Sequence, residues 1–264
     1  LSDSGFENIF QSLKMKHSFP GLIFFISPRE WMISWQFYAE SRKQREARMI
    51  IDANITGYLR SLIHDDANEE FYRIQQEARE GHVPIVKPET KELLRMLISL
   101  TYPMKILEIG TAVGFSALYM NEFQPQGGSV VTIERNEKRI QKAKENIRHL
   151  GREDRITLLE GDAAEILTKI DDSFDFIFMD AAKGQYIYFL EDVLRLLAPR
   201  GLLVSDNVLQ GGDVAKSRYA IERRDRTIHK RMRDFLYQIK NCSVLDTVIL
   251  TVGDGVAISR KTGE

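Results

Sequence analysis

The sequence predicts an α/β fold built on a mostly parallel, doubly wound sheet. From Lys105 onward, short apolar segments that look like buried strands alternate with longer amphipathic segments. This alternation is typical of βαβ units, in which the strands are parallel. Two further apolar segments, joined by the short stretch TVGD, end the chain and predict an antiparallel hairpin. Ligands bind at the carboxyl ends of the strands in such sheets, so those ends are where functional residues are expected.

Two helices are expected before the sheet, over residues 49–64 and 66–80, because apolar residues such as Ile55 and Leu59 recur at helical spacing. A segment with two prolines follows, and Thr90 is expected to cap the next helix. The parallel strands are expected at 105–110, 129–134, 155–161, 174–180 and 201–206. The helices that follow them are expected at 114–123, 136–151, 162–170, 185–199 and 225–239, and the hairpin strands at 243–250 and 255–261.

The first 48 residues differ from the rest and contain both tryptophans, Trp31 and Trp35. Met49 opens an amphipathic segment that looks like the natural start of a chain. One interpretation is that residues 1–48 are a non-native upstream extension, and the other is that they form a helical arm that packs on the core or on a partner. The predicted organisation is therefore an extension over 1–48 and a domain over 49–264.

Composition excludes several classes of protein. The single Cys242 excludes an internal disulfide and a cysteine-based zinc site, and it favours a cytoplasmic setting. The longest apolar run near the start, GLIFFI, is far shorter than the ~20 residues of a membrane span, so no membrane partner is expected. The net charge of −1 neither predicts nor excludes binding to nucleic acid.

Glycines and acids follow the first three strands. In EIGTAVGFSA, Gly110 and Gly114 permit a tight turn before a helix whose first N–H groups are free, although glycines also make ordinary strand–helix turns. Glu134 follows Gly110 by 24 residues, the kind of distance at which an acid accepts hydrogen bonds from a ribose. In EGDA, Asp162 and Ala163 are placed to contact an adenine, or Asp162 simply caps the next helix.

Acids and an amide follow the next two strands. Asp180 ends one of them, and Asp206 and Asn207 end the other. Their hard oxygen atoms suit Mg²⁺ or Ca²⁺ better than zinc, and two buried acids would repel each other without a cation. The alternative is that Asp206 and Asn207 cap a turn. Lys183 lies three residues past Asp180 and is a candidate general base, or else a solvated surface lysine.

Taken together, the segments LEIGTAVGFSA, VVTIERNEKR, LLEGDA, FIFMDAAKGQY and LVSDNVLQGGDV resemble the cation-dependent class I O-methyltransferases, which use S-adenosylmethionine and include the catechol and caffeoyl-CoA enzymes. The resemblance covers roughly residues 82–260. It implies a Rossmann-like class I methyltransferase fold, with a seven-stranded sheet, a C-terminal antiparallel hairpin and helices on both faces. Within the group, HVPI, IERNEKR, DAAKGQY, DNVL and the terminal VGDG are most similar to the bacterial tRNA 5-hydroxyuridine methyltransferases.

The resemblance also implies roles for single residues. S-adenosylmethionine would be bound by Val86, Glu108, Gly110, Gly114, Ser116, Glu134, Asp162, Ala163 and Asp180. Mg²⁺ would be bound by Asp180, Asp206 and Asn207, and catalysis would involve Lys183 and Asp180. This set of residues argues against a nucleotide-binding protein that transfers no methyl group. The family tends to form homodimers, and a homodimer is expected here.

The metal would chelate two neighbouring oxygens of the acceptor, and both a catechol and 5-hydroxyuridine have such a pair. Residues 217–233 hold six arginines, one lysine and one histidine against two acids. In this segment, Arg218, Arg223 and Arg224 are expected to bind RNA phosphates and Tyr219 to stack on a base, unless the run is a solvated helix face. The predicted function is therefore methylation of 5-hydroxyuridine at the wobble position in the tRNA anticodon loop, and the alternative is a small phenolic acceptor.

Overall fold

The structure is a computed structural model that describes residues 53–63 and 69–263. Contacts divide the chain into two units, residues 1–58 and 59–264. In the first unit, the described residues are the beginning of helix α3 (Ala53–Ser61). The predicted boundary after residue 48 lies outside the described residues, and so do both interpretations of residues 1–48.

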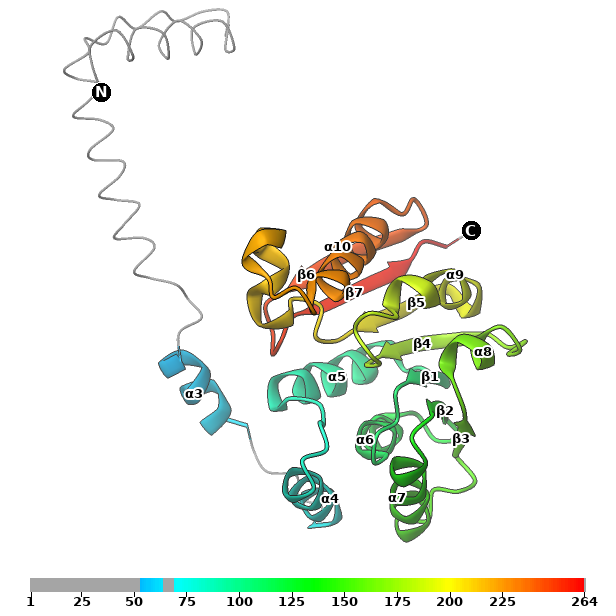
Figure 1. The fold of residues 1–264 in the computed structure, drawn as a ribbon. Helices are drawn as coiled ribbons and strands as arrows, with labels where there is room; N and C mark the ends of the chain where they lie inside the picture. The colour runs from blue at the N-terminus through cyan, green and yellow to red at the C-terminus, as the bar shows by residue number, and fades with distance from the viewer. Residues whose placement is uncertain (1–52, 64–68, 264) are drawn as a thin grey trace, which may run out of the picture. The chain divides into compact units, whose positions relative to one another are not determined.

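The second unit contains one seven-stranded sheet (Figure 1). Its strands are β1 (Lys105–Ile109), β2 (Ser129–Glu134), β3 (Ile156–Glu160), β4 (Phe174–Met179), β5 (Leu197–Ser205), β6 (Leu245–Leu250) and β7 (Val256–Lys261). Their order is β3-β2-β1-β4-β5-β7-β6, and only β7 runs against its neighbours. The predicted sheet and its terminal hairpin are therefore confirmed.

Helices cover both faces of the sheet (Figure 1). The helices α4 (Glu69–Glu80), α5 (Pro88–Thr101), α6 (Phe115–Phe123) and α7 (Glu137–His149) pack on one face, and α8 (Ala163–Leu167), α9 (Tyr186–Leu196) and α10 (Arg226–Asn241) pack on the other. Successive strand residues point to opposite faces, so Ile106 packs in the first core and Leu107 in the second. None of the helices in the described residues is long and apolar enough to cross a membrane.

Two predicted element boundaries are wrong for identifiable reasons. Thr90 does not cap α5, because Pro88 occupies the first helical position and Lys87 precedes it without a side-chain cap. Thr90 therefore lies inside the first turn, where it is fully buried. The helix expected over 185–199 ends at Leu196, because Leu197 already pairs with Phe174 of β4 and begins β5.

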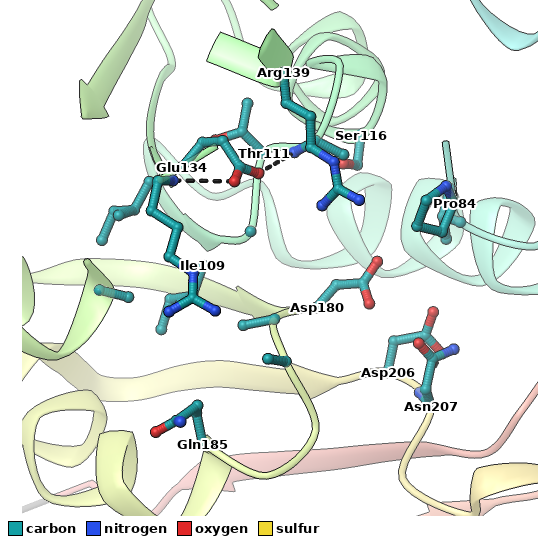
Figure 2. A pocket seen from close by; sticks show the side chains of 18 of the residues that line it. Pro84, Ile109, Thr111, Ser116, Glu134, Arg139, Asp180, Gln185, Asp206 and Asn207 are labelled. Atoms are coloured by element: carbon teal, nitrogen blue, oxygen red, sulfur yellow. Dashed lines mark hydrogen bonds between the residues drawn. The ribbon is translucent and has the colours of Figure 1, made fainter. Parts of the chain in front are cut away.

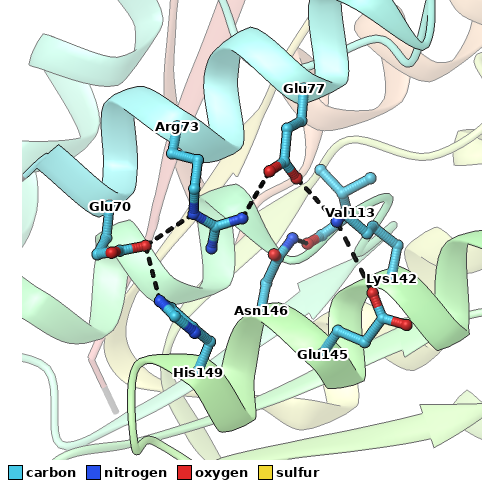
Figure 3. Close-up of polar contacts among 8 residues, drawn as sticks. All are labelled: Glu70, Arg73, Glu77, Val113, Lys142, Glu145, Asn146 and His149. Atoms are coloured by element: carbon cyan, nitrogen blue, oxygen red, sulfur yellow. Dashed lines mark hydrogen bonds and ion pairs between the residues drawn. The ribbon is translucent and has the colours of Figure 1, made fainter.

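Helix α4 is held mainly by apolar contacts. Phe71 is 3% exposed, and its ring lies edge-on to the rings of Phe115 at 5.9 Å and Tyr119 at 5.8 Å. A chain of ion pairs also joins α4 to α7, including Lys142 Nζ to Glu77 Oε2 at 2.7 Å (Figure 3). These pairs are partly exposed, so each contributes little to stability. The position of α4 matters because the segment after it, residues 84–87, lines the cavity described below.

Phe71→Ala is expected to lower the free energy of unfolding by about 3–5 kcal/mol, because it removes a buried ring and leaves a cavity. Denaturant unfolding monitored by circular dichroism measures this loss. The matched control is Tyr72→Ala, since Tyr72 is the next residue of α4 and is 50% exposed. Equal effects of the two substitutions would contradict the assignment of Phe71 to the core.

Candidate functional site

A cavity of about 540 Å³ opens at the carboxyl ends of the parallel strands (Figure 2). The neighbouring strands β1 and β4 are followed by helices on opposite faces of the sheet, and this divergence leaves a crevice between them. Ten of the predicted site residues line the cavity, namely Val86, Gly110, Ser116, Glu134, Asp162, Ala163, Asp180, Lys183, Asp206 and Asn207. Six others do not, namely Glu108, Gly114, Arg218, Tyr219, Arg223 and Arg224.

Gly110 is required by the contact between two strands. Its φ is +108°, and a Cβ atom added there would lie 2.4 Å from the backbone oxygen of Asp180. The glycine therefore permits the close approach of the chain after β1 to the end of β4. The sequence predicted that Gly110 lets the backbone approach a ligand. The structure shows that the glycine is also required by the protein itself, because the Asp180 backbone leaves no room for a side chain.

Gly114 serves helix packing rather than the cavity wall. It precedes α6 with a φ of +83°, and an added Cβ would lie 3.4 Å from Ala143 of α7. Gly114 does not line the cavity, and its predicted role in binding the cofactor stays a prediction. Ser116, two residues further on, does line the cavity.

Glu108 is fully buried and does not reach the cavity wall. Its carboxylate accepts a hydrogen bond from the Thr132 hydroxyl, which in turn lies against that of Thr111. Burial raises the pKa of Glu108 to about 7, although hydrogen bonds from Ser116 and Thr132 oppose the shift. Glu108 therefore lies behind the cavity wall and contacts Ser116, and its predicted role in binding the cofactor stays a prediction.

Glu134 and the first residues of α7 form the wall on the β2 side. Glu134 Oε2 accepts a hydrogen bond from the Ala112 N–H at 2.9 Å, and Oε1 accepts from the N–H groups of Arg135 and Asn136 (Figure 2). These bonds fix the carboxylate at the cavity wall. Oε1 already accepts two hydrogen bonds, but Oε2 keeps a second lone pair, so the group can still accept a hydrogen bond from a ligand hydroxyl.

Asp162 has a structural role that the sequence left open. Its Oδ1 accepts a hydrogen bond from the Ala164 N–H at 2.9 Å and so caps α8. Its Oδ2 pairs with Arg135 Nη1 at 3.1 Å. The capping alternative is therefore confirmed, and Asp162 and Ala163 also line the cavity.

The side chains of Asp180, Asp206 and Asn207 lie at one end of the cavity (Figure 2). Burial first, and then the charge of Asp206, raises the pKa of Asp180 to about 7, while Lys183 opposes the shift. Burial also raises the pKa of Asp206 to about 6, against the hydrogen bond from the Asn207 N–H at 2.7 Å. Two carboxylates this close destabilise each other unless they share a proton or a cation.

The residues present fit a divalent cation. Asp206 is 1% exposed, and its Oδ2 is a buried oxygen with no hydrogen-bond partner among the described residues. Buried acceptors of this kind are normally satisfied, so an unpaired one indicates a missing partner. The set of two carboxylates and one amide offers only hard oxygen ligands. The described residues contain no group of three or more His, Cys, Asp and Glu side chains that could hold a metal, so this mixed set is the candidate.

Lys183 is partly buried at the cavity wall, in the loop between β4 and α9. Its charge lowers the pKa of both Asp180 and Asp206, which places its amine close to them. Arg231 of α10 supports this loop by donating from Nη1 to the Gly184 carbonyl at 3.3 Å. The alternative of a freely solvated lysine does not agree with this position.

The arginine-rich segment lies outside the cavity wall, and several of its side chains have structural partners. Arg226 and Arg233 donate to backbone carbonyls, as Arg231 does. Arg224 pairs with Glu222 at 3.0 Å. Tyr219 is 88% exposed. Of the four residues predicted to bind RNA, Arg224 is therefore already paired within the protein.

Sequence reasoning missed several residues of the cavity wall, including Lys87, Arg139 and Asp254. Lys87 directly follows Val86, which was predicted to line the cofactor pocket, so the position of Lys87 in the sequence could have identified it. Asp254 lies in the turn of the hairpin. That turn is at the same edge as the carboxyl ends of the parallel strands, because β6 runs in their direction.

Comparison with known families identifies an O-methyltransferase model that matches residues 65–262. A catechol O-methyltransferase from Niastella koreensis is 34% identical over 133 residues, which are 49% of this chain and 60% of that enzyme. The chain thus spans less than two thirds of the length of this relative.

Solved structures share the fold. One from Staphylococcus aureus, assigned to the caffeoyl-CoA O-methyltransferases, is 36% identical, covers 80% of this chain and 100% of its own, and has a TM-score of 0.73. An O-methyltransferase from Bacillus cereus, solved in complex with S-adenosylhomocysteine (SAH), is 26% identical and has a TM-score of 0.70. The match covers 78% of this chain and 96% of that structure.

The raised pKa values predict how stability depends on pH when no cation is bound. Groups whose pKa is higher in the folded state stabilise the protein below their unfolded pKa, and that stability is lost as pH rises through the folded pKa. For Asp180 the pKa rises from 3.8 to about 7, and for Asp206 from 3.8 to about 6. The free energy of unfolding in EDTA is therefore expected to fall between about pH 4 and pH 7, by up to roughly 3–4 kcal/mol per carboxyl group.

Asp180→Asn is expected to reduce this slope, and added Mg²⁺ is expected to restore stability at pH 8. The control is Asp172→Asn, because Asp172 is exposed and pairs with Lys105 at the other end of the sheet. Denaturant unfolding at several pH values is the measurement. A stability in EDTA that stays level from about pH 4 to pH 7 would contradict the close approach of the two carboxylates.

Proposed function

The chain belongs to the S-adenosylmethionine-dependent O-methyltransferases of the catechol and caffeoyl-CoA type, and on that premise we propose that it methylates a hydroxyl group of a small phenolic acceptor. The acceptor has a second oxygen next to the reacting hydroxyl. The observation that carries this proposal is the buried, unpaired Oδ2 of Asp206 beside Asp180 and Asn207, which suits a cation that binds two neighbouring oxygens.

The proposed binding mode places the methionine portion of S-adenosylmethionine against Val86 and Ser116. Glu134 accepts a hydrogen bond from a ribose hydroxyl with the Oε2 lone pair that its backbone partners leave free. Ala163 lies beside the adenine, and Asp162 holds that wall in place by capping α8. All of these residues line the same cavity, which supports one continuous site for the cofactor.

Asp180, Asp206 and Asn207 would hold the divalent cation at the other end of the cavity. A bound cation would fix two oxygens of the acceptor and lower the pKa of the reacting hydroxyl. The polypeptide contributes the fixed position of its three ligands. The Tyr186 hydroxyl supports that position, since it lies 3.1 Å from the Met179 carbonyl oxygen and 3.0 Å from that of Asp206.

Lys183 is proposed as the general base. When bound, S-adenosylmethionine would supply an electrophilic methyl group on a sulfonium, and S-adenosylhomocysteine would leave as the carbon–sulfur bond breaks and the acceptor oxygen takes the methyl group. Lys183 would act in its neutral amine form, with Nζ accepting the proton that the acceptor hydroxyl loses. The Lys183 loop is held at Gly184 by Arg231, which keeps the amine at the cavity wall.

The acceptor is proposed to be a small phenol because the relatives are named for such acceptors. The Niastella koreensis enzyme is a catechol O-methyltransferase, and a Zea mays relative that is 31% identical over 64% of this chain is a caffeoyl-CoA O-methyltransferase. The partners of Arg226, Arg231 and Arg233 within the protein also reduce the number of arginines free to bind phosphates.

A second candidate acceptor is 5-hydroxyuridine in tRNA, which carries a similar pair of oxygens. The exposed Tyr219 ring and the neighbouring Arg218 and Arg223 favour it, because they form an aromatic and basic surface of the kind that binds single-stranded RNA. For this acceptor, the uracil base would be unstacked from its neighbours and would enter the same cavity, next to the same cation ligands.

Transfer of labelled methyl groups from S-adenosylmethionine should distinguish the two acceptors. The expected result is methylation of a catechol with Mg²⁺, abolished by EDTA, and no incorporation into tRNA that lacks the modification. Incorporation into tRNA alone would overturn the phenolic acceptor and favour the second candidate. In that event Arg218→Ala with Arg223→Ala should abolish RNA methylation, whereas Arg224→Ala should not, because Arg224 is paired with Glu222.

Lys183→Met is expected to lower kcat by about 10²–10⁴-fold, the usual contribution of a general base. Binding of S-adenosylhomocysteine, measured by calorimetry, should stay within about twofold of the wild-type value because Lys183 is not part of the proposed cofactor wall. Lys230→Met is the control, since Lys230 is an exposed lysine of α10 that pairs with Asp234. A kcat close to that of the control would remove Lys183 from the reaction.

A further inference from the structure

The loop that carries two of the proposed cation ligands has an unusual backbone. In this Asp206 loop (residues 206–209), Asn207 has a φ of +58°, and Gln210 directly after the loop has a φ of +51°. Such left-handed conformations are uncommon for residues other than glycine, and although asparagine adopts them more readily than most, at Gln210 the surroundings must hold this conformation in place. The contacts of this loop therefore decide where the Asn207 side chain points.

The hairpin between β6 and β7 supplies those contacts through its tip (residues 252–255). The N–H of Val208 donates to the Gly255 carbonyl at 2.9 Å, and the N–H of Leu209 donates to the Asp254 carbonyl at 3.0 Å. Gly255 has a φ of +89°, and an added Cβ would lie 2.2 Å from Leu209 Cγ. The hairpin tip and the Asp206 loop thus fit against each other without room for a single methyl group.

The start of α5 holds the hairpin tip from the other side. Lys87 Nζ lies 2.6 Å from Asp254 Oδ1, across 167 residues of sequence. A Cβ added to Gly253 would lie 2.8 Å from Thr90 Oγ1, and the same Thr90 hydroxyl lies 3.5 Å from Asp206 Oδ1. Three segments that are distant in sequence therefore meet behind the proposed cation ligands.

We propose that the hairpin tip acts as a support for the Asp206 loop, and that Lys87 is a positioning residue that fastens this support through its ion pair with Asp254. This inference rests on the proposed function, because it assigns Lys87 to the cation site. Lys87 does not touch the cation. Lys87 holds Asp254, and the hairpin tip accepts backbone hydrogen bonds from Val208 and Leu209. Through these contacts Lys87 fixes the position of Asn207.

The ion pair itself adds little to global stability. The Lys87 and Asp254 side chains are 39% and 30% exposed, and pairs in contact with water are worth little. Its local effect is larger, because residues that orient metal ligands typically change metal affinity by 10–100-fold when they are removed. Lys87 should therefore affect cation affinity much more than it affects the unfolding temperature.

Electrostatics and positioning predict opposite effects for the loss of Lys87. Removing its positive charge leaves Asp254 unpaired near the cation site, which would strengthen cation binding if only charge mattered. Loss of the support would instead weaken binding, because Asn207 would no longer be held in its left-handed conformation. The sign of the change in affinity separates the two explanations.

The experiment is titration of Mn²⁺ into the full-length protein with S-adenosylhomocysteine present, followed by electron paramagnetic resonance of free Mn²⁺. Lys87→Met is expected to weaken Mn²⁺ binding by about tenfold. Lys87→Arg is expected to restore most of the affinity because it keeps the ion pair. Asp254→Asn should weaken binding as well, and Lys87→Met should add little to it in the double variant.

Lys105→Met is the matched control, because Lys105 pairs with Asp172 at 2.7 Å at the opposite end of the sheet. Its Mn²⁺ affinity should equal that of the wild type. Unchanged or tighter binding in Lys87→Met would overturn the inference, as would a fall in its unfolding temperature that Lys87→Arg does not restore. A raised KM for the acceptor with unchanged Mn²⁺ affinity would assign the ion pair to acceptor binding instead. Failure of the wild-type protein to bind Mn²⁺ would overturn the proposed function itself.

Discussion

Two carboxylates at the ends of neighbouring strands repel each other, and the rest of the site is arranged around this repulsion. Asp180 and Asp206 follow β4 and β5, which lie side by side in the sheet, so their side chains meet at one edge. Burial raises the pKa of each carboxyl group, which means that their charged forms are costly without a partner. The proposed divalent cation would remove that cost and would give the unpaired Oδ2 of Asp206 a partner.

The surrounding structure keeps these carboxylates together despite their repulsion. Gly110 lets the chain after β1 approach the backbone of Asp180, where any side chain would clash. The Tyr186 hydroxyl lies between the carbonyl groups of Met179 and Asp206, at the ends of both strands. The hairpin adds a contact to the Asp206 loop from outside the parallel part of the sheet. The close approach of the two carboxylates is thus maintained by contacts from the segment after β1, from α9 and from the hairpin.

Much of the fold and ten residues of the cavity wall could be predicted from local sequence. Asp180 and Asp206 were predictable because each directly follows an apolar strand, and parallel strands end at one edge. Gly114 and Glu108 lie outside the cavity wall, which the sequence could not show because a turn glycine and a strand acid look the same whether they face a ligand or the protein interior. The pair of Lys87 and Asp254 was missed because no local pattern connects residues that are 167 positions apart. The partners of Arg226 and Arg233 in the arginine-rich segment could not be predicted, because charge composition does not reveal which side chains bind backbone carbonyls.

Anomalous diffraction from crystals of the protein grown with Mn²⁺ and S-adenosylhomocysteine tests the central claim most directly. The account predicts one strong peak at the end of the cavity, about 2.0–2.6 Å from carboxylate oxygens of Asp180 and Asp206 and from the amide oxygen of Asn207. A map with no peak there, in crystals where S-adenosylhomocysteine is bound, would contradict the assignment of these three residues to a cation.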